Sequence, residues 1–245
     1  SYDHQDKGGD GICVHYQGRR KGDEGGAIAH LIRPTEAIFE EQLAYVRNYA
    51  ALRLERNPEI MAQLGSSLGF LGMVGFLQPQ RMRKTRDVLA VSLNVTRLVQ
   101  QRVKHVLACR RPIEYSPQVQ PMIQTPGHGS LPSGHATEAF VLAFVLHALM
   151  TAKRNGGKKG KESDEGKQAA SGSDPAFVQL MRHAERIAIN RTVAGVHFPA
   201  DSAAGMVFGQ ALADYYIKRF GGTRDVHTRT FRGTAFAGDF SYQDV

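Results

Sequence analysis

Two basic residues beside a proline are the first feature of this sequence that could bind an anion. Lys104 and Arg111 are seven residues apart, or two helical turns, so their side chains leave the same face of a helix. Pro112 then ends that helix and leaves Arg111 at its edge. Because a helix dipole alone favours basic residues near a C-terminus, this pair by itself indicates little.

A second group, Ser133-Gly134-His135, stands immediately before an apolar segment. Gly134 lets the backbone come close to a ligand, and the first turn of a helix leaves free N–H groups at that place. Such a turn is a favourable site for an oxyanion. Taken alone, the group is equally typical of a helix capped by Ser133 beside a structural His135.

The third group holds Arg191, His197 and Asp201 at the junction of two predicted helices. Pro199 suits a helix start, which places Asp201 in the first turn, four residues after His197. A carboxylate there would keep one imidazole nitrogen as a donor and leave the other as a nucleophile or metal ligand. A structural His–Asp cap would explain the same spacing.

Together the three groups resemble the signature Lys-x6-Arg-Pro, Pro-Ser-Gly-His and Ser-Arg-x5-His-x3-Asp. It belongs to the superfamily that unites phosphatidic acid phosphatases type 2, class A bacterial acid phosphatases and vanadium-dependent haloperoxidases. The resemblance runs from Lys104 to Asp201, about 40% of the chain, and departs only at Asn190, where the family has Ser. It implies a helical bundle with a site for phosphate or vanadate.

The resemblance also implies a role for each residue of the signature. Three cations would neutralise the oxygens of the anion, and a hydroxyl and an amide would add hydrogen bonds: Lys104, Arg111 and Arg191, with Ser133 and Gly134. His197 would attack phosphorus or bond to vanadium, with Asp201 orienting it. His135 would transfer protons.

Neighbouring residues point to both branches of the superfamily. The stretch TPGHGSL at 125–131 is similar to the bromide-oxidising vanadium enzymes and makes His128 a candidate for a halide pocket. In contrast, the His-x-Pro-x-Asp pattern at 197–201 is that of many phosphatases, and the chain is short for a haloperoxidase. We favour a haloperoxidase in which vanadate on His197 activates hydrogen peroxide to oxidise bromide. The alternative is a soluble phosphatase that hydrolyses phosphate monoesters through phospho-His197 without a cofactor. A non-enzymatic anion-binding protein ranks below both, because every chemical residue is present.

The elements that must position these residues are predicted to be helical. Apolar residues at helical spacing indicate helices at 35–56, 59–77, 83–110, 136–151, 177–191 and 199–219. The third of these is a long amphipathic helix, and one side of it carries Val88, Val91, Val95, Leu98, Val99, Val103, Val106 and Leu107. No convincing strand is found. The predicted fold is an all-α bundle of about six helices with long loops that carry the site.

Residues 34–220 are predicted to form one catalytic domain. Residues 1–33 are rich in Gly and charge and are expected to be an irregular arm. Residues 153–173 are low in complexity and predict a mobile surface loop. No structure is predicted for the tail at 221–245.

Composition limits the partners. The net charge of +8 suits an anionic substrate, and the basic run at 153–167 is mixed with acidic residues, so no nucleic-acid partner is expected. Cys13 and Cys109 give no disulfide framework. The expected partner is a small molecule, either peroxide and halide or a phosphate ester, and a homo-oligomer is left open.

The apolar stretches at 66–77 and 136–152 are shorter than the roughly 20 residues of a bilayer span. We therefore predict a soluble protein without a transmembrane span, in a compartment that the sequence leaves undecided.

Overall fold

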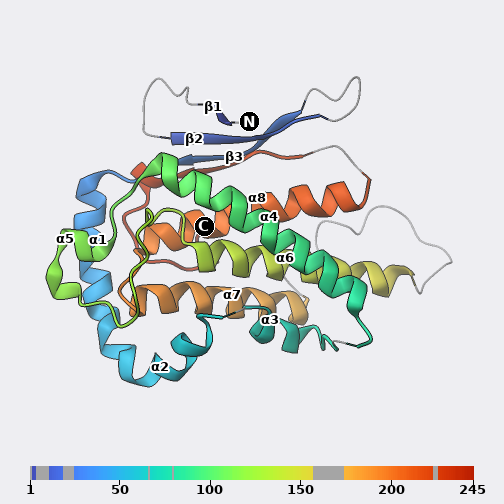
Figure 1. Ribbon diagram of the computed structural model, residues 1–245, viewed down its shortest axis with the longest axis horizontal. Helices are drawn as coiled ribbons and strands as arrows, with labels where there is room; N and C mark the ends of the chain where they lie inside the picture. The colour runs from blue at the N-terminus through green and yellow to red at the C-terminus, as the bar shows by residue number, and fades with distance from the viewer. Residues whose placement is uncertain are drawn as a thin grey trace.

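The computed structural model describes residues 2–3, 11–18, 25–65, 67–78, 80–156, 174–222 and 226–245, and it is mostly helical (Figure 1). Four long helices make its centre: α4 (Arg83–Leu107), α6 (Gly134–Gly156), α7 (Pro175–Val193) and α8 (Pro199–Phe220). Helix α6 packs against the other three. The predicted helical bundle is therefore confirmed in its main part.

Helices α6 and α8 approach each other closely because α8 has glycines at the contact. A Cβ added at Gly205 would lie 2.8 Å from the Cβ of Ala136, and one at Gly209 would lie 2.8 Å from the carbonyl oxygen of Thr137. Any larger residue would therefore force the helices apart. This contact fixes the start of α8 beside the start of α6, and the predicted site residues lie at those two helix starts.

Shorter helices cover one end and one side of the bundle. They are α1 (Glu36–Tyr49), the 3-10 turn η1 (Ala50–Leu52), α2 (Arg53–Ala62), α3 (Leu68–Val74), α5 (Pro112–Tyr115) and the 3-10 turn η2 (Pro117–Val119). The helix predicted at 35–56 is divided by η1, and Pro58 lies inside α2. The helix predicted at 59–77 is interrupted, because α2 ends before Gly65 and α3 starts after it.

A four-stranded sheet was missed by the all-α prediction. It contains β1 (Tyr2–Asp3), β2 (Gly11–Tyr16), β3 (Gly26–Ile32) and β4 (Arg229–Arg232) in that order, with β3 and β4 parallel and the other pairs antiparallel. The sheet packs on α8 (Figure 1). The expected irregular arm is thus wrong for β2 and β3, and the tail adds β4 and the 3-10 turn η4 (Gly233–Ala235).

Helix α4 faces the core with only part of its predicted apolar side, because Val103 and Leu107 are buried while three other members of that side are exposed. Val91, Val95 and Leu98 are exposed by 52%, 40% and 62%. The buried side combines apolar residues with a polar row at a spacing of four: Ser92, Thr96, Gln100 and Lys104. Each of these residues makes a hydrogen bond, and the hydroxyl of Thr96, for example, lies 3.2 Å from that of Tyr216, although Oε1 of Gln100 has no partner among the described residues. The core therefore accepts a polar stripe that ends at the candidate site.

Helix α6 corrects the expectation that no segment is long enough to cross a membrane. The helix begins at Gly134 and continues past the apolar stretch, so it contains a 19-residue window, Gly134–Ala152, with a mean hydropathy of 1.4. By length and composition that window meets the requirements of a span. Of the mobile loop predicted at 153–173, residues 157–173 lie outside the described residues.

Candidate functional site

The predicted site lies where four helices meet at one end of the bundle. Helices α4 and α7 end there, and α6 and α8 begin there (Figure 1). The C-terminal ends bring basic residues, and the N-terminal ends bring free backbone N–H groups. A backbone bond from the N–H of Ser133 to the carbonyl of Asp201 joins the two helix starts at 2.9 Å.

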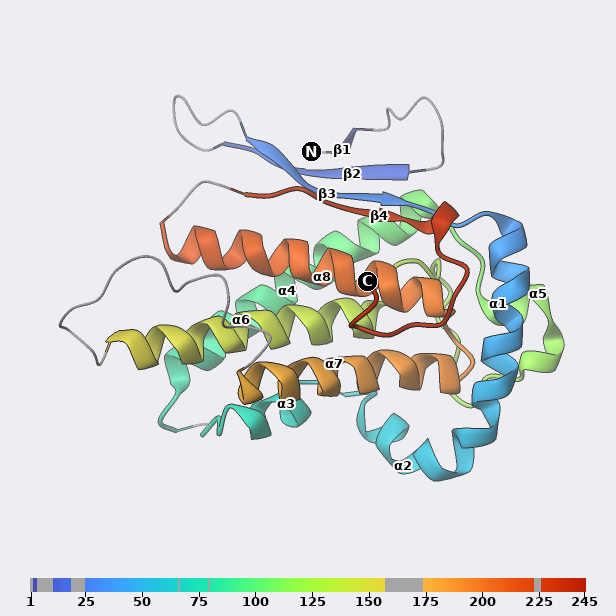
Figure 2. The same cartoon turned by 180° about the vertical axis from the view of Figure 1, so that it is seen from behind.

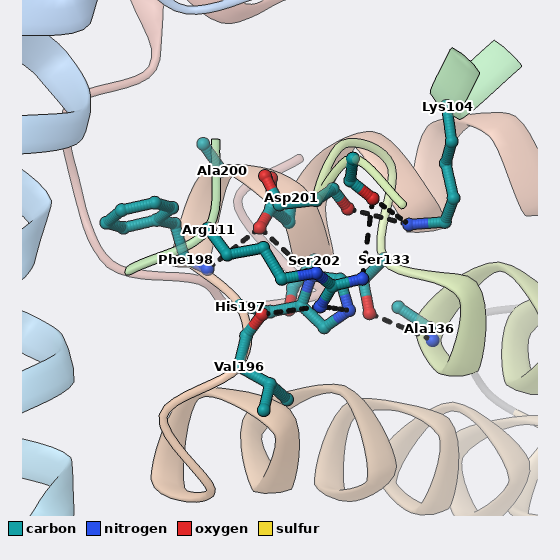
Figure 3. Close-up of polar contacts among 12 residues, drawn as sticks. Lys104, Arg111, Ser133, Ala136, Val196, His197, Phe198, Ala200, Asp201 and Ser202 are labelled. Atoms are coloured by element: carbon teal, nitrogen blue, oxygen red, sulfur yellow. Dashed lines mark hydrogen bonds and ion pairs between the residues drawn. The ribbon is translucent and has the colours of Figure 1, made fainter. Parts of the chain in front are cut away.

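His197 and Asp201 form the buried pair that the spacing predicted. His197 lies in the connection from α7 to α8, and its Nδ1 is 3.0 Å from Oδ2 of Asp201 in the first turn of α8 (Figure 3). The same Oδ2 accepts from the N–H of Phe198 at 2.9 Å, and Oδ1 accepts from the hydroxyl of Ser130 at 3.2 Å. A carboxylate with these donors holds the proton on Nδ1, so Nε2 carries the lone pair.

Burial keeps the imidazole of His197 neutral. Its side chain is almost completely buried, and burial together with the charge of Arg111 holds the pKa of His197 well below its usual range. Burial also raises the pKa of Asp201 to about 6, while the hydrogen bond from Phe198 acts in the opposite direction. The neutral ring with a free Nε2 is the form that a nucleophile requires.

Arg111 faces this ring from the end of α4. Its Nη1 donates to the carbonyl of Val196 at 2.8 Å and lies 3.4 Å from Nε2 of His197 (Figure 3). Lys104, one turn before the end of α4, donates from Nζ to the carbonyls of Ser130 at 2.8 Å and Gly129 at 3.1 Å. Burial and the charge of Arg111 lower the pKa of Lys104 to about 7. Both cations are therefore held by carbonyls and repel each other, a situation that an anion would relieve.

Arg191 carries hydrogen-bond donors that the protein does not use. The side chain is fully buried in α7, and its Nη2 donates to Oε1 of Gln63 at 2.8 Å. Within the described part of the chain, its Nε and Nη1 have no hydrogen-bond partner, although both atoms are buried. Burial lowers the pKa of Arg191 to about 10, which leaves it charged at neutral pH. A buried guanidinium with two unmet donors needs an acceptor, and a tetrahedral oxyanion would supply it.

The start of α6 holds Ser133, Gly134 and His135. The hydroxyl of Ser133 accepts weakly from the N–H of Ala136 at 3.5 Å, so the residue does cap the helix. A Cβ at Gly134 would lie 3.2 Å from the side-chain amide of Gln100. Any residue other than glycine would therefore require a small shift of Gln100. Burial and the charge of Arg191 lower the pKa of His135 to about 4, while a hydrogen bond to the backbone of Gln63 acts in the opposite direction.

His128 lies at the outer edge of the site. Its Nδ1 is 3.2 Å from Nη2 of Arg111, and its carbonyl accepts from Nε of the same residue at 3.1 Å. The side chain is exposed and borders a cavity of about 690 Å³ between the end of α4 and residues 125–129, which Lys104 also lines. His128 thus touches the cluster through Arg111, while its role in a halide pocket stays a prediction.

Two residues that contact the site were not predicted from the sequence. Gln63, at the end of α2, accepts from Arg191, and Ser130 donates to Asp201. Gln63 lies outside the three motifs, and no feature of its surroundings in the sequence pointed to it. Asn190, where the family pattern has Ser, is buried and donates from Nδ2 to Oε1 of Gln63 at 3.1 Å.

Comparison with solved structures shows a similar fold in a membrane enzyme. One match is to the first transmembrane PAP2 type phosphatidylglycerolphosphate phosphatase, from Bacillus subtilis. It has a TM-score of 0.55 and 19% identity, and it covers 77% of this chain and 88% of that one. The prediction of a soluble protein without a span is therefore wrong. This fold occurs in a transmembrane protein, and α6 is apolar and long enough for a span.

Among curated sequences, short matches occur in proline–tRNA ligases. The chain is 41% identical over 69 residues to the enzyme of Xanthomonas oryzae pv. oryzae and 42% identical over 67 residues to that of Xanthomonas campestris pv. campestris. These matches cover 28% and 27% of this chain and 12% of each ligase. The chain thus spans only a small part of those proteins, and their activity does not carry over to it.

A family model gives the assignment. The model of the PAP2 superfamily matches residues 88–222, a stretch that contains every residue of the predicted anion site. That match covers more than half of the chain, and the protein belongs to the PAP2 superfamily.

Proposed function

We propose that this protein is a phosphatase that hydrolyses phosphate monoesters through a phosphohistidine at His197. The observation that carries the proposal is a neutral imidazole, held by Asp201, next to an Arg191 guanidinium with two unmet donors. Membership of the superfamily and the likeness to a PAP2-type phosphatase favour this activity over the haloperoxidase that we preferred from the sequence. The phosphatase needs no vanadate cofactor.

The phosphate group would bind among the three buried cations. Arg191 would give its Nε and Nη1 to phosphate oxygens, and the free N–H groups at the start of α6 would add further donors. Arg111 would turn the N–H that now faces Nε2 of His197 toward a phosphate oxygen, and its bonds to the carbonyls of Val196 and His128 would hold its position. Lys104 would complete the positive charge around the anion.

In the first chemical step, the lone pair of Nε2 of His197 attacks phosphorus. The N–P bond forms as the P–O bond to the alcohol breaks, and the leaving oxygen takes a proton from His135. The two histidines are close enough for charge on His135 to act on the pKa of His197. The unliganded site disfavours a charged His135, but a bound phosphate dianion would raise its pKa by Coulomb attraction.

In the second step, water attacks the phosphorus of the phosphohistidine. His135, now neutral, takes a proton from that water, the N–P bond breaks, and inorganic phosphate leaves with His197 again neutral. Asp201 keeps the proton on Nδ1 throughout and stabilises the positive charge that the ring carries while it is phosphorylated. The three cations stabilise the five-coordinate transition state.

The same donors fit vanadate, because vanadate is also a tetrahedral oxyanion and can adopt the five-coordinate geometry of the transition state. It would bind to the donors of Arg191 with His197 beside it. In a phosphatase, vanadate then acts as an inhibitor that competes with the phosphate ester.

The test measures phosphate release from an aryl phosphate monoester by the wild type, by His197→Ala and by His105→Ala, in which an exposed histidine of α4 is removed as a control. We expect His197→Ala to lose turnover by at least about a thousandfold, since the nucleophile is gone. The wild type should yield an acid-labile phosphoenzyme on rapid quenching, and His105→Ala should match the wild type.

Retained turnover in a folded His197→Ala variant would overturn the assignment of the nucleophile. The proposal would also fail if vanadate-loaded protein brominated a dye with peroxide at an ordinary enzymatic rate, about 10 per second, while phosphate release stayed at trace level.

A further inference from the structure

Helix α3 and the residues after it form an exposed apolar surface beside basic residues. The side chains of Met73 and Phe76 are 63% and 82% exposed. Figures 1 and 2 show α3 on the side of the helical layer away from the sheet, next to α7. We call this surface the α3 patch and define it by Leu68, Gly72, Met73, Phe76 and Leu77. An exposed phenylalanine and methionine in contact with one cavity mark a surface for a partner.

A cavity opens within the patch. It has a volume of about 720 Å³, and its apolar walls come from α3 and the turn that follows. Gln78 and Arg86 give it a polar edge. Because Arg86 lies in the first turns of α4, the cavity joins the apolar patch to the basic start of that helix.

The segment of the chain that carries the patch is basic. Residues 60–86 contain no Asp or Glu, and their four basic residues gather at the end that adjoins the patch: Arg81, Arg83, Lys84 and Arg86. The next acidic residue is Asp87. Exposed apolar side chains that border a cluster of Lys and Arg are typical of segments that lie in the interface of an anionic membrane.

We propose that the α3 patch docks on the surface of a membrane that contains anionic phospholipid. Phe76 and Met73 would enter the boundary between headgroups and acyl chains, and the basic residues at 81–86 would contact the lipid phosphates. A second copy of the chain fits this surface poorly, because a two-fold contact would bring the same basic residues against each other across the interface.

The proposal is independent of the catalytic site. None of the patch residues belongs to the anion site, so variants of the patch should keep their activity on a water-soluble phosphate ester. Activity on such an ester therefore serves as the control for correct folding of the patch variants. A wild type without activity on this ester would contradict the proposed function alone and would leave the docking proposal unaffected.

The experiment is flotation of the full chain with vesicles of phosphatidylcholine alone or mixed with phosphatidylglycerol. We expect binding to the mixed vesicles that weakens as salt is added, with little binding to the neutral ones. Arg83→Glu with Lys84→Glu should weaken partition by more than about fivefold for each residue, because a basic residue near an anionic surface contributes about 1 kcal/mol. Met73→Ser with Phe76→Ser should reduce partition by at least about tenfold.

Two matched controls separate the patch from general surface effects. Leu54→Ser removes an apolar side chain of α2 that is 94% exposed, and Arg47→Glu reverses an exposed charge on α1. Both should bind vesicles like the wild type. Equal binding to both kinds of vesicle, or loss of binding in the controls to the same extent, would overturn the proposal. Dimerisation without lipid that is lost in Met73→Ser with Phe76→Ser would assign the patch to a second copy instead.

Discussion

Three buried cations define the chemistry of this site at the scale of single residues. Burial lowers the pKa of Lys104 to about 7 and that of Arg191 to about 10, and the charge of Arg111 adds to the lowering for Lys104. Carbonyl groups satisfy Lys104 and Arg111, whereas Arg191 keeps two donors without a partner. In the proposed phosphatase, the site would thus be organised for an anion before the anion arrives, which is the condition for electrostatic stabilisation of a transition state.

Gln63 lies outside the motifs and contacts this cluster directly. Its Oε1 accepts from Arg191 and from Asn190, its Nε2 donates to Oε1 of Glu59 at 3.0 Å, and its backbone bonds His135. We expect Gln63→Ala to lower kcat/KM roughly 10- to 100-fold, because a hydrogen bond to a charged group is worth about 1.5–3 kcal/mol. Gln63→Glu should weaken phosphate binding further, since its carboxylate would pair with Arg191.

Inhibition constants distinguish a positioning role of Gln63 from a purely structural one. The constants for phosphate and vanadate should rise together with KM in both variants, while Gln101→Ala, on the exposed side of α4, should change none of them. Unchanged inhibition constants with a lower melting temperature would mean that Gln63 only supports the fold.

The proximity of the residues of the three motifs could be predicted because their spacing places them at the ends of neighbouring helices. Lys104, Arg111, His197 and Asp201 lie where the spacing of helical turns and a Pro-initiated helix places them. Gln63 could not be found in this way, because a glutamine that accepts from an arginine across helices leaves no periodic trace in the sequence. Its partner is decided only by the packing of α2 on α7.

At the scale of elements, α4 shows why hydrophobic periodicity predicted only part of the buried face. Val91, Val95 and Leu98 have the spacing of a core stripe, yet they are exposed. The buried side instead contains a polar residue in every turn, from Ser92 to Lys104. Periodicity counts apolar residues and cannot recognise a buried row of polar residues whose hydrogen bonds go mostly to other parts of the fold. That row continues along α4 to the candidate anion site. The proposed function therefore explains part of the difference between the predicted and the observed buried face of the helix.

The connection between α7 and α8 is a second element whose conformation serves the site. Gly195 lies between Arg191 and His197 with a φ of +79°, and a Cβ there would be 2.7 Å from the guanidinium of Arg53. Arg53 holds this connection by donating to the carbonyls of Val193 at 2.9 Å and Gln120 at 2.8 Å. The glycine is required both by its backbone conformation and by this close approach.

We therefore expect Gly195→Ala to reduce the free energy of unfolding by about 1–3 kcal/mol, since alanine is strained at positive φ. It should also lower kcat, because His197 is two residues away. Gly238→Ala, where nothing lies within 4 Å of an added Cβ, is the matched control and should keep both quantities near those of the wild type. Denaturant unfolding and steady-state kinetics measure the two effects, and wild-type kcat in Gly195→Ala would mean that this connection does not position the nucleophile.

At the scale of the whole molecule, the helical bundle was predictable and the sheet was not. The bundle follows from long apolar segments, whose periodicity is a local property of the sequence. The sheet pairs β3 near the start of the chain with β4 near its end, in parallel register from Ala29 with Arg229 to Ile32 with Arg232. A strand of four residues with one buried side chain, as in β4, carries no recognisable alternation. Its pairing depends on the closure of the entire fold.

The buried charge of the site should make the free energy of unfolding of the whole protein depend on pH. Lys104 has a folded-state pKa of about 7, against 10.5 for the ordinary side chain. Between these values the unfolded chain binds more protons, so this group makes the free energy of unfolding rise with pH from about 7 upward. The stabilisation is complete above the unfolded pKa and is lost as the pH falls toward 7.

Urea unfolding at pH 7 and pH 9, with and without inorganic phosphate, measures this linkage. Phosphate at about 100 times its Kd should stabilise the protein by about 2.7 kcal/mol, and it should reduce the pH dependence because the anion restores the charge of Lys104. Lys104→Met should show a smaller rise between pH 7 and pH 9 and a weaker response to phosphate, whereas Lys84→Met, on the exposed start of α4, should behave like the wild type. An identical rise with pH in Lys104→Met would mean that the buried ammonium does not carry the linkage, and the three-cation description of the site would have to be replaced by one in which Arg111 and Arg191 alone hold the anion.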